Sequence, residues 1–325
     1  MLVLTKREVE SLLDPDALRA AVAAALADLS AGRASMPTRI AAMVPQRGGL
    51  LAAMPAFLPA SGALTTKLVS LFPRNTDRPT HQAVILAFDP LTGSPAALMD
   101  GEAITAARTA AGSALATDLL ARKDAATLAV LGTGVQARAH LRALPRVRHF
   151  REIVIGARDM SRASALARET SSQTGVSVRA ASFSDAVRAA DVVCACTHSA
   201  DPVVRRDWLR PGTHVNSVGY NTAGREVDGE TVAASLVVVE SRAAALAPPP
   251  GGSNDLLWPI RDGLIAPTHV HAELGELVTG SRTGRADATQ LTLYKSVGVA
   301  VEDAAAAALV LRLARERGVG KMIDL

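Results

Sequence analysis

The pattern of apolar and polar positions changes near residue 119. From there onward, short runs rich in Val, Ile and Ala alternate with stretches of helical or turn-like pattern. The runs are an apolar segment that begins at residue 128, then 152–158, 176–180, 191–197, 214–219 and 236–240. Runs that are apolar on both faces are typical of parallel strands with helices on each side. The pattern therefore predicts a doubly wound α/β domain over residues 119–299.

The first 118 residues have a different pattern. An Ala- and Leu-rich helical region over about 6–31 precedes short β-like segments that Gly, Pro and Asp turns separate. These segments lead into a strongly apolar helix over 104–122. The order predicts an α+β domain over 1–118 with an antiparallel sheet, to which a C-terminal helix (about 300–317, within 300–325) returns. Such a domain is suited to substrate binding and dimerisation.

The most informative motif is the string LAVLGTGVQARAHLRAL. Gly132 allows a tight turn from strand to helix, Gly134 lets the backbone approach a pyrophosphate, and Ala137 lets the helix pack close to the sheet. The helix begins at Val135 and Gln136, where free N–H groups and the helix dipole favour an anion. With parallel strands around it, this turn predicts a Rossmann-type dinucleotide-binding domain.

The end of the second predicted strand bears on the choice of cofactor. NAD-preferring domains place an Asp or Glu there, about twenty residues beyond the glycine turn, which accepts hydrogen bonds from the ribose. Here the position holds Arg158, with Ser161 and Arg162 close by in sequence. A guanidinium pairs with a 2′-phosphate and stacks on adenine, so the sequence favours NADP(H) over NAD(H). The alternative is that Asp159 binds the ribose, if the strand ends one residue later.

Composition narrows the class of protein. With 325 residues, 49% of them hydrophobic and 20% charged, the chain can form about two globular domains. Its net charge of +4 comes with scattered arginines and 3% aromatic residues, a composition that argues against a nucleic-acid-binding surface. No apolar run approaches the roughly 18 residues that span a membrane, and the first residues lack a signal-peptide pattern. We therefore expect a cytoplasmic protein with no membrane partner.

Two further segments have structural interpretations. Cys194 and Cys196 alternate on one predicted strand, so they face opposite sides and we expect no metal site. Residues 247–259 (APPPGGSNDLLWP) are predicted to form a long loop, because Pro and Gly interrupt a helix. This loop is either a lid or disordered link, or a plain surface connector.

Several strings taken together resemble one protein family. They are KLVSLFPRN, THQAVILAFD, DGEAITAARTAAGSALA, VLGTGVQARAH, NSVG and REVD, in that order. The chain resembles the ornithine cyclodeaminase and mu-crystallin family over nearly its whole length. The resemblance implies an enzyme that uses NAD(H) or NADP(H) and acts at the α-carbon of an amino or imino acid. Family activities include cyclodeamination, alanine dehydrogenation and reduction of ketimines or cyclic imines, and some members are nucleotide-dependent binders or structural proteins.

The resemblance assigns roles to individual residues. Arg39, Lys67 and Arg108 stand at positions that hold the substrate carboxylate in relatives, and Arg108 also approaches the cofactor. An arginine fork suits this task because it binds both carboxylate oxygens. Lys67 has a second interpretation as a proton donor, if burial lowers its pKa. Further cofactor contacts implied by the resemblance are Thr80, Thr109, Val218 and Gly219. Relatives pair through the antiparallel sheet, which implies a homodimer formed through residues 35–100.

One position distinguishes the family's activities. Cyclodeaminases carry a catalytic aspartate in the loop after the fifth strand, and the corresponding residue here is Asn221. Asparagine cannot accept a proton as a carboxylate does, and it is equally suited to a turn. Asp228 is another candidate base, but its place before GETVAA predicts a helix N-cap.

We therefore expect an α-imino acid reductase whose catalytic positions are Lys67, Arg108 and Asn221. Its substrate would be a cyclic imine, such as pyrroline- or piperideine-2-carboxylate, or a ketimine. Replacing Lys67 or Arg108 by alanine should weaken catalysis and leave the fold intact. The alternatives are a cyclodeaminase or alanine dehydrogenase, and a non-catalytic NADPH-dependent binding protein.

Overall fold

The computed structural model describes residues 1–249 and 251–324, and the chain divides into two compact units. Unit 1 consists of Met1–Arg108 and Gly298–Leu325, whereas unit 2 is the continuous segment Thr109–Val297. The division falls inside helix α3 (Gly101–Leu120), ten residues before the boundary at 118 that the sequence pattern predicts.

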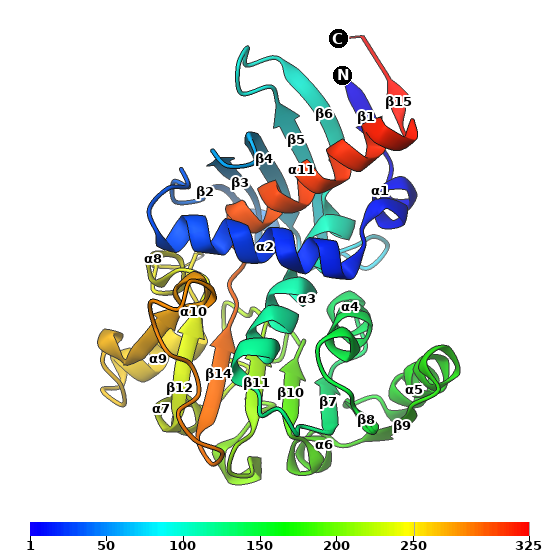
Figure 1. Ribbon diagram of the computed structural model, residues 1–325. Helices are drawn as coiled ribbons and strands as arrows, with labels where there is room; N and C mark the ends of the chain where they lie inside the picture. Colours follow the sequence, from blue (N-terminus) through cyan, green and yellow to red (C-terminus); the bar gives the residue numbers. More distant parts are fainter. Residues whose placement is uncertain (250, 325) are drawn as a thin grey trace. The chain divides into compact units, whose positions relative to one another are not determined.

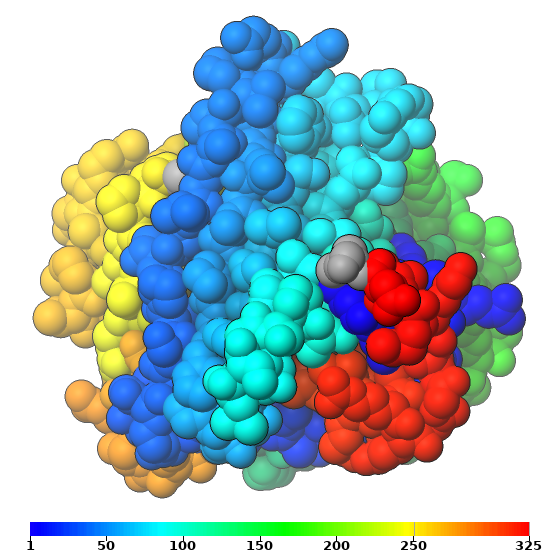
Figure 2. Space-filling model, turned by 90° about the horizontal axis from the view of Figure 1, so that it is seen from above, coloured from blue at the N-terminus to red at the C-terminus, as the bar shows by residue number. Residues whose placement is uncertain are grey.

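Unit 1 contains a seven-stranded sheet in the order β15-β1-β6-β5-β4-β3-β2. Its strands are β1 (Leu2–Leu4), β2 (Ile40–Val44), β3 (Gly49–Leu58), β4 (Ala63–Leu71), β5 (His81–Phe88), β6 (Pro95–Asp100) and β15 (Lys321–Met322). Strands β2 to β6 are antiparallel neighbours, as the sequence predicts. The two terminal strands β1 and β15 also pair, and Figures 1 and 2 show them side by side.

The helices of unit 1 lie along one face of this sheet (Figure 1). They are α1 (Lys6–Leu12), α2 (Pro15–Ser30) and α11 (Ala300–Arg317). The single helical region predicted over 6–31 is therefore two helices, because Asp14 caps a new helix and Pro15 stands at its first turn. The predicted C-terminal helix coincides with α11, which packs on β3, β4 and β5.

Alternation along the strands explains how the sheet of unit 1 binds these helices. In β4 every second side chain, from Ala63 to Val69, is buried, and the residues between them are partly exposed. Strands β3, β5 and β6 repeat the pattern. We call the buried face of the sheet its inner face and the other its outer face. Lys67 is the one charged residue among the inner-face positions of β4.

Unit 2 contains an eight-stranded parallel sheet in the order β13-β12-β14-β11-β10-β7-β8-β9. Its strands are β7 (Thr127–Leu131), β8 (Glu152–Gly156), β9 (Ser177–Ala181), β10 (Val192–Ala195), β11 (His214–Ser217), β12 (Ser235–Val239), β13 (Val270–Glu273) and β14 (Leu291–Lys295). Its helices after α3 are α4 (Val135–Ala143), α5 (Met160–Thr174), α6 (Phe183–Ala189), α7 (Gly229–Ala234), α8 (Arg242–Ala245), α9 (Asn254–Arg261) and α10 (Leu274–Val278). The predicted Rossmann-type α/β fold is confirmed.

The strand order places the glycine turn at a functional position. The chain after β7 goes to β8 on one side, and β10 occupies the other side of β7. This reversal of strand order is the topological switch point, where parallel α/β sheets bind ligands beside the carboxyl ends of their strands. Gly132 follows β7 directly, so the turn lies at that point.

The prediction of a loop over 247–259 is wrong for the second half of this range, which is helical. Helix α9 begins at Asn254, because the Ser253 hydroxyl accepts a hydrogen bond from the N–H of Asp255 and caps it. Pro259 lies within this helix. Pro250 lies outside the described residues. No helix among the described residues has the length and apolar character to cross a membrane.

Candidate active site

Two cations predicted for the substrate carboxylate meet a buried aspartate in unit 1. Lys67 Nζ, on the inner face of β4, lies 2.7 Å from Asp303 Oδ2 in the first turn of α11. Arg108, in α3, donates from Nε to Asp303 Oδ1 (3.0 Å). Lys67 and Arg108 are 2% and 4% exposed, so water screens these ion pairs little. Asp303 thus brings together two residues that are far apart in the sequence.

A second carboxylate and a glycine complete the surroundings of Arg108. Its Nη1 donates to Glu302 Oε2 (2.8 Å), and the N–H of Val299 donates to the same oxygen (3.2 Å). Gly298 has φ +71°, and a Cβ at this position would lie 2.6 Å from the Arg108 guanidinium nitrogens. Arg39 Nη2 donates to the carbonyl of Gly298 (2.7 Å). The turn before α11 therefore lies against both arginines.

The electrostatics of this cationic cluster, defined as Arg39, Lys67 and Arg108, favour an anionic ligand. Burial, assisted by the neighbouring arginines, lowers the pKa of Lys67 from 10.5 to about 8, although Asp303 opposes the shift. Burial disfavours the charged form of Asp303, but Arg108 and Lys67 hold its pKa below the ordinary value. Three cations face two buried carboxylates, so the cluster carries a positive charge that a substrate carboxylate would neutralise.

Four residues that surround this cluster were not predicted from the sequence, namely Gly298, Glu302, Asp303 and His81. Glu302 and Asp303 stand in the first turn of a helix, where acidic residues are common for dipole reasons alone. Gly298 precedes the helix as many glycines do. His81 shares the inner face with Lys67, and its pKa falls to about 4 because of burial and then the Lys67 and Arg108 charges. A weak signal was present, since Glu and Asp are adjacent in an otherwise apolar run.

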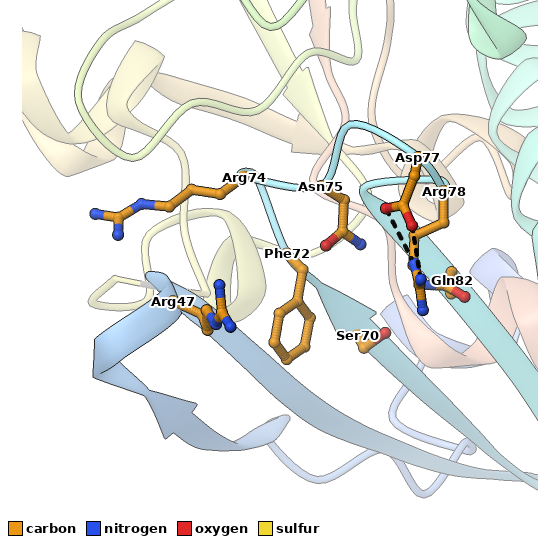
Figure 3. Close-up of a pocket in the computed structure, with 8 residues that line it drawn as sticks. All are labelled: Arg47, Ser70, Phe72, Arg74, Asn75, Asp77, Arg78 and Gln82. Atoms are coloured by element: carbon orange, nitrogen blue, oxygen red, sulfur yellow. Dashed lines mark hydrogen bonds and ion pairs between the residues drawn. The ribbon is translucent and has the colours of Figure 1, made fainter.

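Thr80, a predicted cofactor contact, is exposed in the loop between β4 and β5, and its carbonyl accepts from the N–H of Phe72. The same loop forms most of a pocket of about 430 Å³. The residues that line the pocket are Arg47, Ser70, Phe72, Arg74, Asn75, Asp77, Arg78 and Gln82 (Figure 3). Arg78 pairs with its neighbour Asp77 at 2.7 Å. Lys67 and Ser70 alternate to opposite faces of β4, so this pocket does not include the cationic cluster.

The glycine turn of unit 2 fits a nucleotide diphosphate. Gly132 has φ +111°, and a Cβ there would lie 2.9 Å from the carbonyl oxygen of Cys196. A Cβ at Gly134, the N-cap of α4, would meet nothing within 4 Å, which leaves room for phosphate beside the free N–H groups. Ala137 is fully buried, Val135 is 62% exposed, and the buried side-chain oxygen of Gln136 has no hydrogen-bond partner in the described chain.

The structure separates the two candidate ribose-binding residues. Strand β8 ends at Gly156, and the exposed Arg158 follows it. Asp159 is the N-cap of α5 and accepts from the N–H of Arg162 (3.1 Å). Ser161 and Arg162 are exposed in the first turn of the same helix. The Asp159 carboxylate thus caps helix α5, whereas the Arg158 side chain is exposed just after the end of β8.

The loop after β11 contains Val218, Gly219 and Asn221. The Asn221 side chain donates to the carbonyl of His198 (2.7 Å) and accepts from the N–H of Ala223 (2.8 Å). Both ends of its amide therefore hold the turn, and its catalytic assignment stays a prediction. Asp228 caps α7 as predicted, accepting from the N–H of Thr231 (2.8 Å). Thr109 is buried in α3 directly after Arg108.

Comparisons with known proteins agree on one family. The model of the ornithine cyclodeaminase/mu-crystallin family matches residues 1–318. The ketimine reductase mu-crystallin of Mus musculus is 37% identical over 248 residues, which is 75% of this chain and 74% of that protein. The structure of a Thermococcus litoralis Δ1-pyrroline-2-carboxylate reductase in complex with NADH and L-proline has a TM-score of 0.95 and 39% identity, covering 99% of this chain and 100% of that one.

An archaeal alanine dehydrogenase dimer with bound NAD is also similar, with a TM-score of 0.93 and 31% identity over 100% of this chain and 99% of that one. The similarity extends over both units in each structural comparison. Together with the matched motifs, these findings confirm the resemblance predicted from the sequence: the chain belongs to the ornithine cyclodeaminase/mu-crystallin family.

Proposed function

We propose that this protein is an NAD(P)H-dependent reductase of α-imino acids, acting on a cyclic imine or a ketimine. The observation that carries the proposal is the cationic cluster, in which Lys67 and Arg108 are buried and Arg39 is partly exposed. This cluster is suited to one carboxylate next to a reducible C=N bond. Relatives named as a ketimine reductase and a pyrroline-2-carboxylate reductase support the same reaction class.

In the proposed reaction the arginines bind and orient the substrate. Arg108 offers a planar fork whose position Glu302 and Asp303 fix, so little freedom is lost when a carboxylate binds. The Lys67 ammonium, with a pKa of about 8, gives its proton to the imine nitrogen and regains one from water, while the Asp303 carboxylate holds the lysine in place. A bound reduced nicotinamide supplies the hydride for C2. The product is the α-amino acid.

Asn221 favours imine reduction over the oxidative cyclisation of a diamino acid. Its amide is used in the turn and has no basic site for an ammonium proton. We expect NADPH or NADH oxidation, followed at 340 nm, with Δ1-pyrroline-2-carboxylate, and negligible ammonia release from ornithine. Efficient formation of proline from ornithine would refute the proposal. Tight nucleotide binding without turnover of any imino acid would instead indicate a binding protein.

NADPH is the proposed cofactor, because Arg158 is exposed after β8 and Asp159 caps α5. Replacing Arg158 by alanine removes the guanidinium that would pair with the 2′-phosphate. We expect kcat/KM for NADPH to fall about tenfold, which corresponds to roughly 1.4 kcal/mol, and kcat/KM for NADH to change by less than about twofold.

The control for this variant is Arg188→Ala, which removes an exposed guanidinium in the last turn of α6 that already pairs with Asp207. Steady-state kinetics with both cofactors provide the measurement. A wild-type protein that uses NADH as well as or better than NADPH would contradict the proposed preference.

We also propose a homodimer that buries the outer face of the sheet in unit 1. This face carries Leu51 and Val84, which are 49% and 41% exposed, and at the sheet edge Ile40 and Met43 are 70% and 58% exposed. Partly exposed Phe57, Leu64, Leu68, Leu86, Phe88 and Leu98 adjoin them on paired strands. Contiguous apolar surface of this kind marks an interaction site. Figure 2 shows the blue-to-cyan strands at the surface of unit 1.

Light scattering on a sizing column should give twice the chain mass of 33.6 kDa for the wild-type protein at micromolar concentration. Leu51→Glu should give the monomer mass, because it puts a charge in the apolar interface. The matched control is Leu264→Glu, at a leucine of similar exposure (48%) in unit 2. A wild-type monomer, or an unchanged Leu51→Glu dimer, would refute this interface.

A further inference from the structure

A buried lysine stands at the carboxyl end of β14 in unit 2. Lys295 is 0% exposed, and its ammonium donates to Ser217 Oγ (3.0 Å) and to the carbonyl of Gly219 (2.7 Å), and pairs with Asp255 Oδ2 (2.9 Å). An ammonium has three N–H donors, so the three partners use all of them. The lysine thereby joins the end of β11 to the start of α9.

Two buried carboxylates surround this lysine. Asp255 Oδ1 accepts from the N–H groups of Glu226 (2.8 Å) and Val227 (2.7 Å), and its Oδ2 accepts from Ser253 Oγ (2.8 Å). Burial opposes the ionisation of Asp255, but Lys295 and these donors hold its pKa below the ordinary value. Burial raises the pKa of Glu226, although Lys295 opposes the shift. We call Lys295, Asp255 and Glu226 the Lys295 network.

Glu226 connects the network to the ends of two further strands. Its Oε1 accepts from the N–H (2.6 Å) and the hydroxyl (2.8 Å) of Thr197, which follows β10. Its Oε2 accepts from Ser217 Oγ (2.9 Å) and from the N–H of Gly219 (2.9 Å). The network therefore binds the carboxyl ends of β10, β11 and β14 together, on the edge of the sheet where parallel α/β folds bind ligands.

The backbone of Gly219 is held on both sides. Its N–H donates to Glu226 and its carbonyl accepts from Lys295. A Cβ at this position would lie 2.2 Å from the carbonyl oxygen of Thr197 and 2.6 Å from the carboxylate of Glu226. The turn Ser217–Gly219 thus has one closely packed conformation. Farther along the loop, the amide of Asn254 donates to carbonyls of Asn221 and Gly224, which fixes its remainder to the start of α9.

Stability alone gives little reason for such a network. Three ionised groups lose their hydration here, and a buried ion pair seldom stabilises a fold more than apolar residues of the same size would. The network instead fixes the geometry of the loop, because its hydrogen bonds are directional and the oxygens of Glu226 and Asp255 all have donors. A rigid turn next to the topological switch point is what a cofactor-binding loop requires.

We propose that Lys295, Asp255 and Glu226 are positioning residues that preset the Ser217–Gly219 turn to receive the nicotinamide end of the nucleotide. This inference rests on the proposed function, because it requires that a pyridine nucleotide binds to unit 2. The adenosine and diphosphate parts meet other residues, at the glycine turn after β7 and at Arg158. The network should therefore affect one end of the nucleotide only.

Binding measurements without substrate test this difference. Titration calorimetry compares NADPH with 2′-phospho-ADP-ribose, which is the same molecule without the nicotinamide ring, and NADH with ADP-ribose. Each carboxylate oxygen of Glu226 accepts a hydrogen bond from a backbone N–H group, and in Glu226→Gln an NH2 group replaces one of these two oxygens. One of the two hydrogen bonds is lost, so the turn must shift. We expect the Kd of NADPH and of NADH to rise at least tenfold, and the Kd of each fragment to stay within twofold of the wild-type value.

A milder variant and a control accompany this measurement. Ser217→Ala removes one hydroxyl from the network and keeps all the charges, so it should fold and raise the NADPH Kd about threefold. Glu230→Gln makes the same chemical change as Glu226→Gln at an exposed site on α7 and should leave every Kd unchanged.

The possible results separate the two proposals. If NADPH and its fragment weaken equally in Glu226→Gln and Ser217→Ala, the network supports the fold of unit 2 generally and the positioning role is wrong. Unchanged affinities in both variants would also overturn it. If the wild-type protein binds neither nucleotide nor fragment, the proposed function itself fails.

Discussion

The Arg108→Ala variant is expected to unfold at a markedly lower temperature than the wild-type protein and to lose most of its imine reductase activity. Arg108 is buried and pairs with both Glu302 and Asp303, so its removal leaves two carboxylates with fewer partners in a place that water does not reach. Breaking a buried ion pair on one side costs about 3–5 kcal/mol. In a chain of 325 residues each kcal/mol lowers Tm by about 1.5 °C.

Scanning calorimetry and steady-state kinetics check the two parts of this prediction. Arg138→Ala is the matched control, because Arg138 pairs with Glu169 at the surface, where both side chains are more than 40% exposed and such a pair contributes about 0–1 kcal/mol. Arg108→Lys should restore much of the stability but little activity, since a lysine lacks the planar fork. An Arg108→Ala protein with wild-type Tm would show that the two carboxylates are stable without the arginine.

This prediction revises the expectation from the sequence, which was that the fold would be intact without Arg108. The motif ITAARTAA identifies Arg108 by its resemblance to relatives, but it does not indicate which residues contact the Arg108 side chain. Glu302 and Asp303 are nearly two hundred residues farther along the chain. Their contact with Arg108 depends on how α11 returns to unit 1.

The Lys67→Met variant should reduce kcat for imine reduction about a hundredfold or more, which is within the range for loss of a general acid. Because burial lowers the pKa of Lys67 to about 8, the wild-type ammonium is the main form below that pH. Wild-type kcat should therefore be highest below pH 8 and fall as the pH rises through it. In Lys67→Met this decline should be absent, and any titration that remains belongs to the substrate.

The control is Lys123→Met, which changes a lysine whose side chain is 84% exposed. The kinetic constants also separate the two roles of Lys67. A rise in KM with unchanged kcat would mean that the lysine only binds the carboxylate. A wild-type kcat that does not change between pH 7 and pH 9.5 would contradict proton donation by Lys67.

The linkage between Lys67 and stability has the opposite sign to its effect on activity. Its pKa in the folded protein is lower than in the unfolded chain, so the unfolded chain binds the proton more tightly. The destabilising contribution of the charged lysine is fully present below pH 8. It diminishes as the pH rises toward 10.5, the ordinary pKa of lysine.

The sequence predicted best those elements whose pattern is long or chemically specific. The helix over 300–317, the glycine turn and the strand β8 all follow from periodicity or from residue types with one physical use. The pair β1 and β15 escaped prediction, because strands of two or three residues have no measurable period. The loop predicted to extend to residue 259 shows the opposite error, since Ser253 starts a helix that Pro259 does not prevent.

Only those residues of the candidate site that stand in the family motifs could be predicted from the sequence. Resemblance located Arg39, Lys67 and Arg108, and the structure places all three around the start of α11. Their counter-ions and the Lys295 network had no such signal. Lys295 ends an apolar strand and could as well have been a solvated charge, because only tertiary contacts determine whether a lysine at a strand end is buried.

The discontinuous course of unit 1 has a consequence for the synthesis of the protein. Met1–Arg108 leaves the ribosome long before Gly298–Leu325, which supplies α11 and its two acids. Until then the inner face of the nascent sheet lacks its covering helix, and Lys67 has no Asp303 to pair with. Unit 2 is continuous and can fold as soon as it emerges. We therefore expect translation to yield a folded nucleotide domain preceded by an aggregation-prone sheet that requires chaperone protection until the last helix is made.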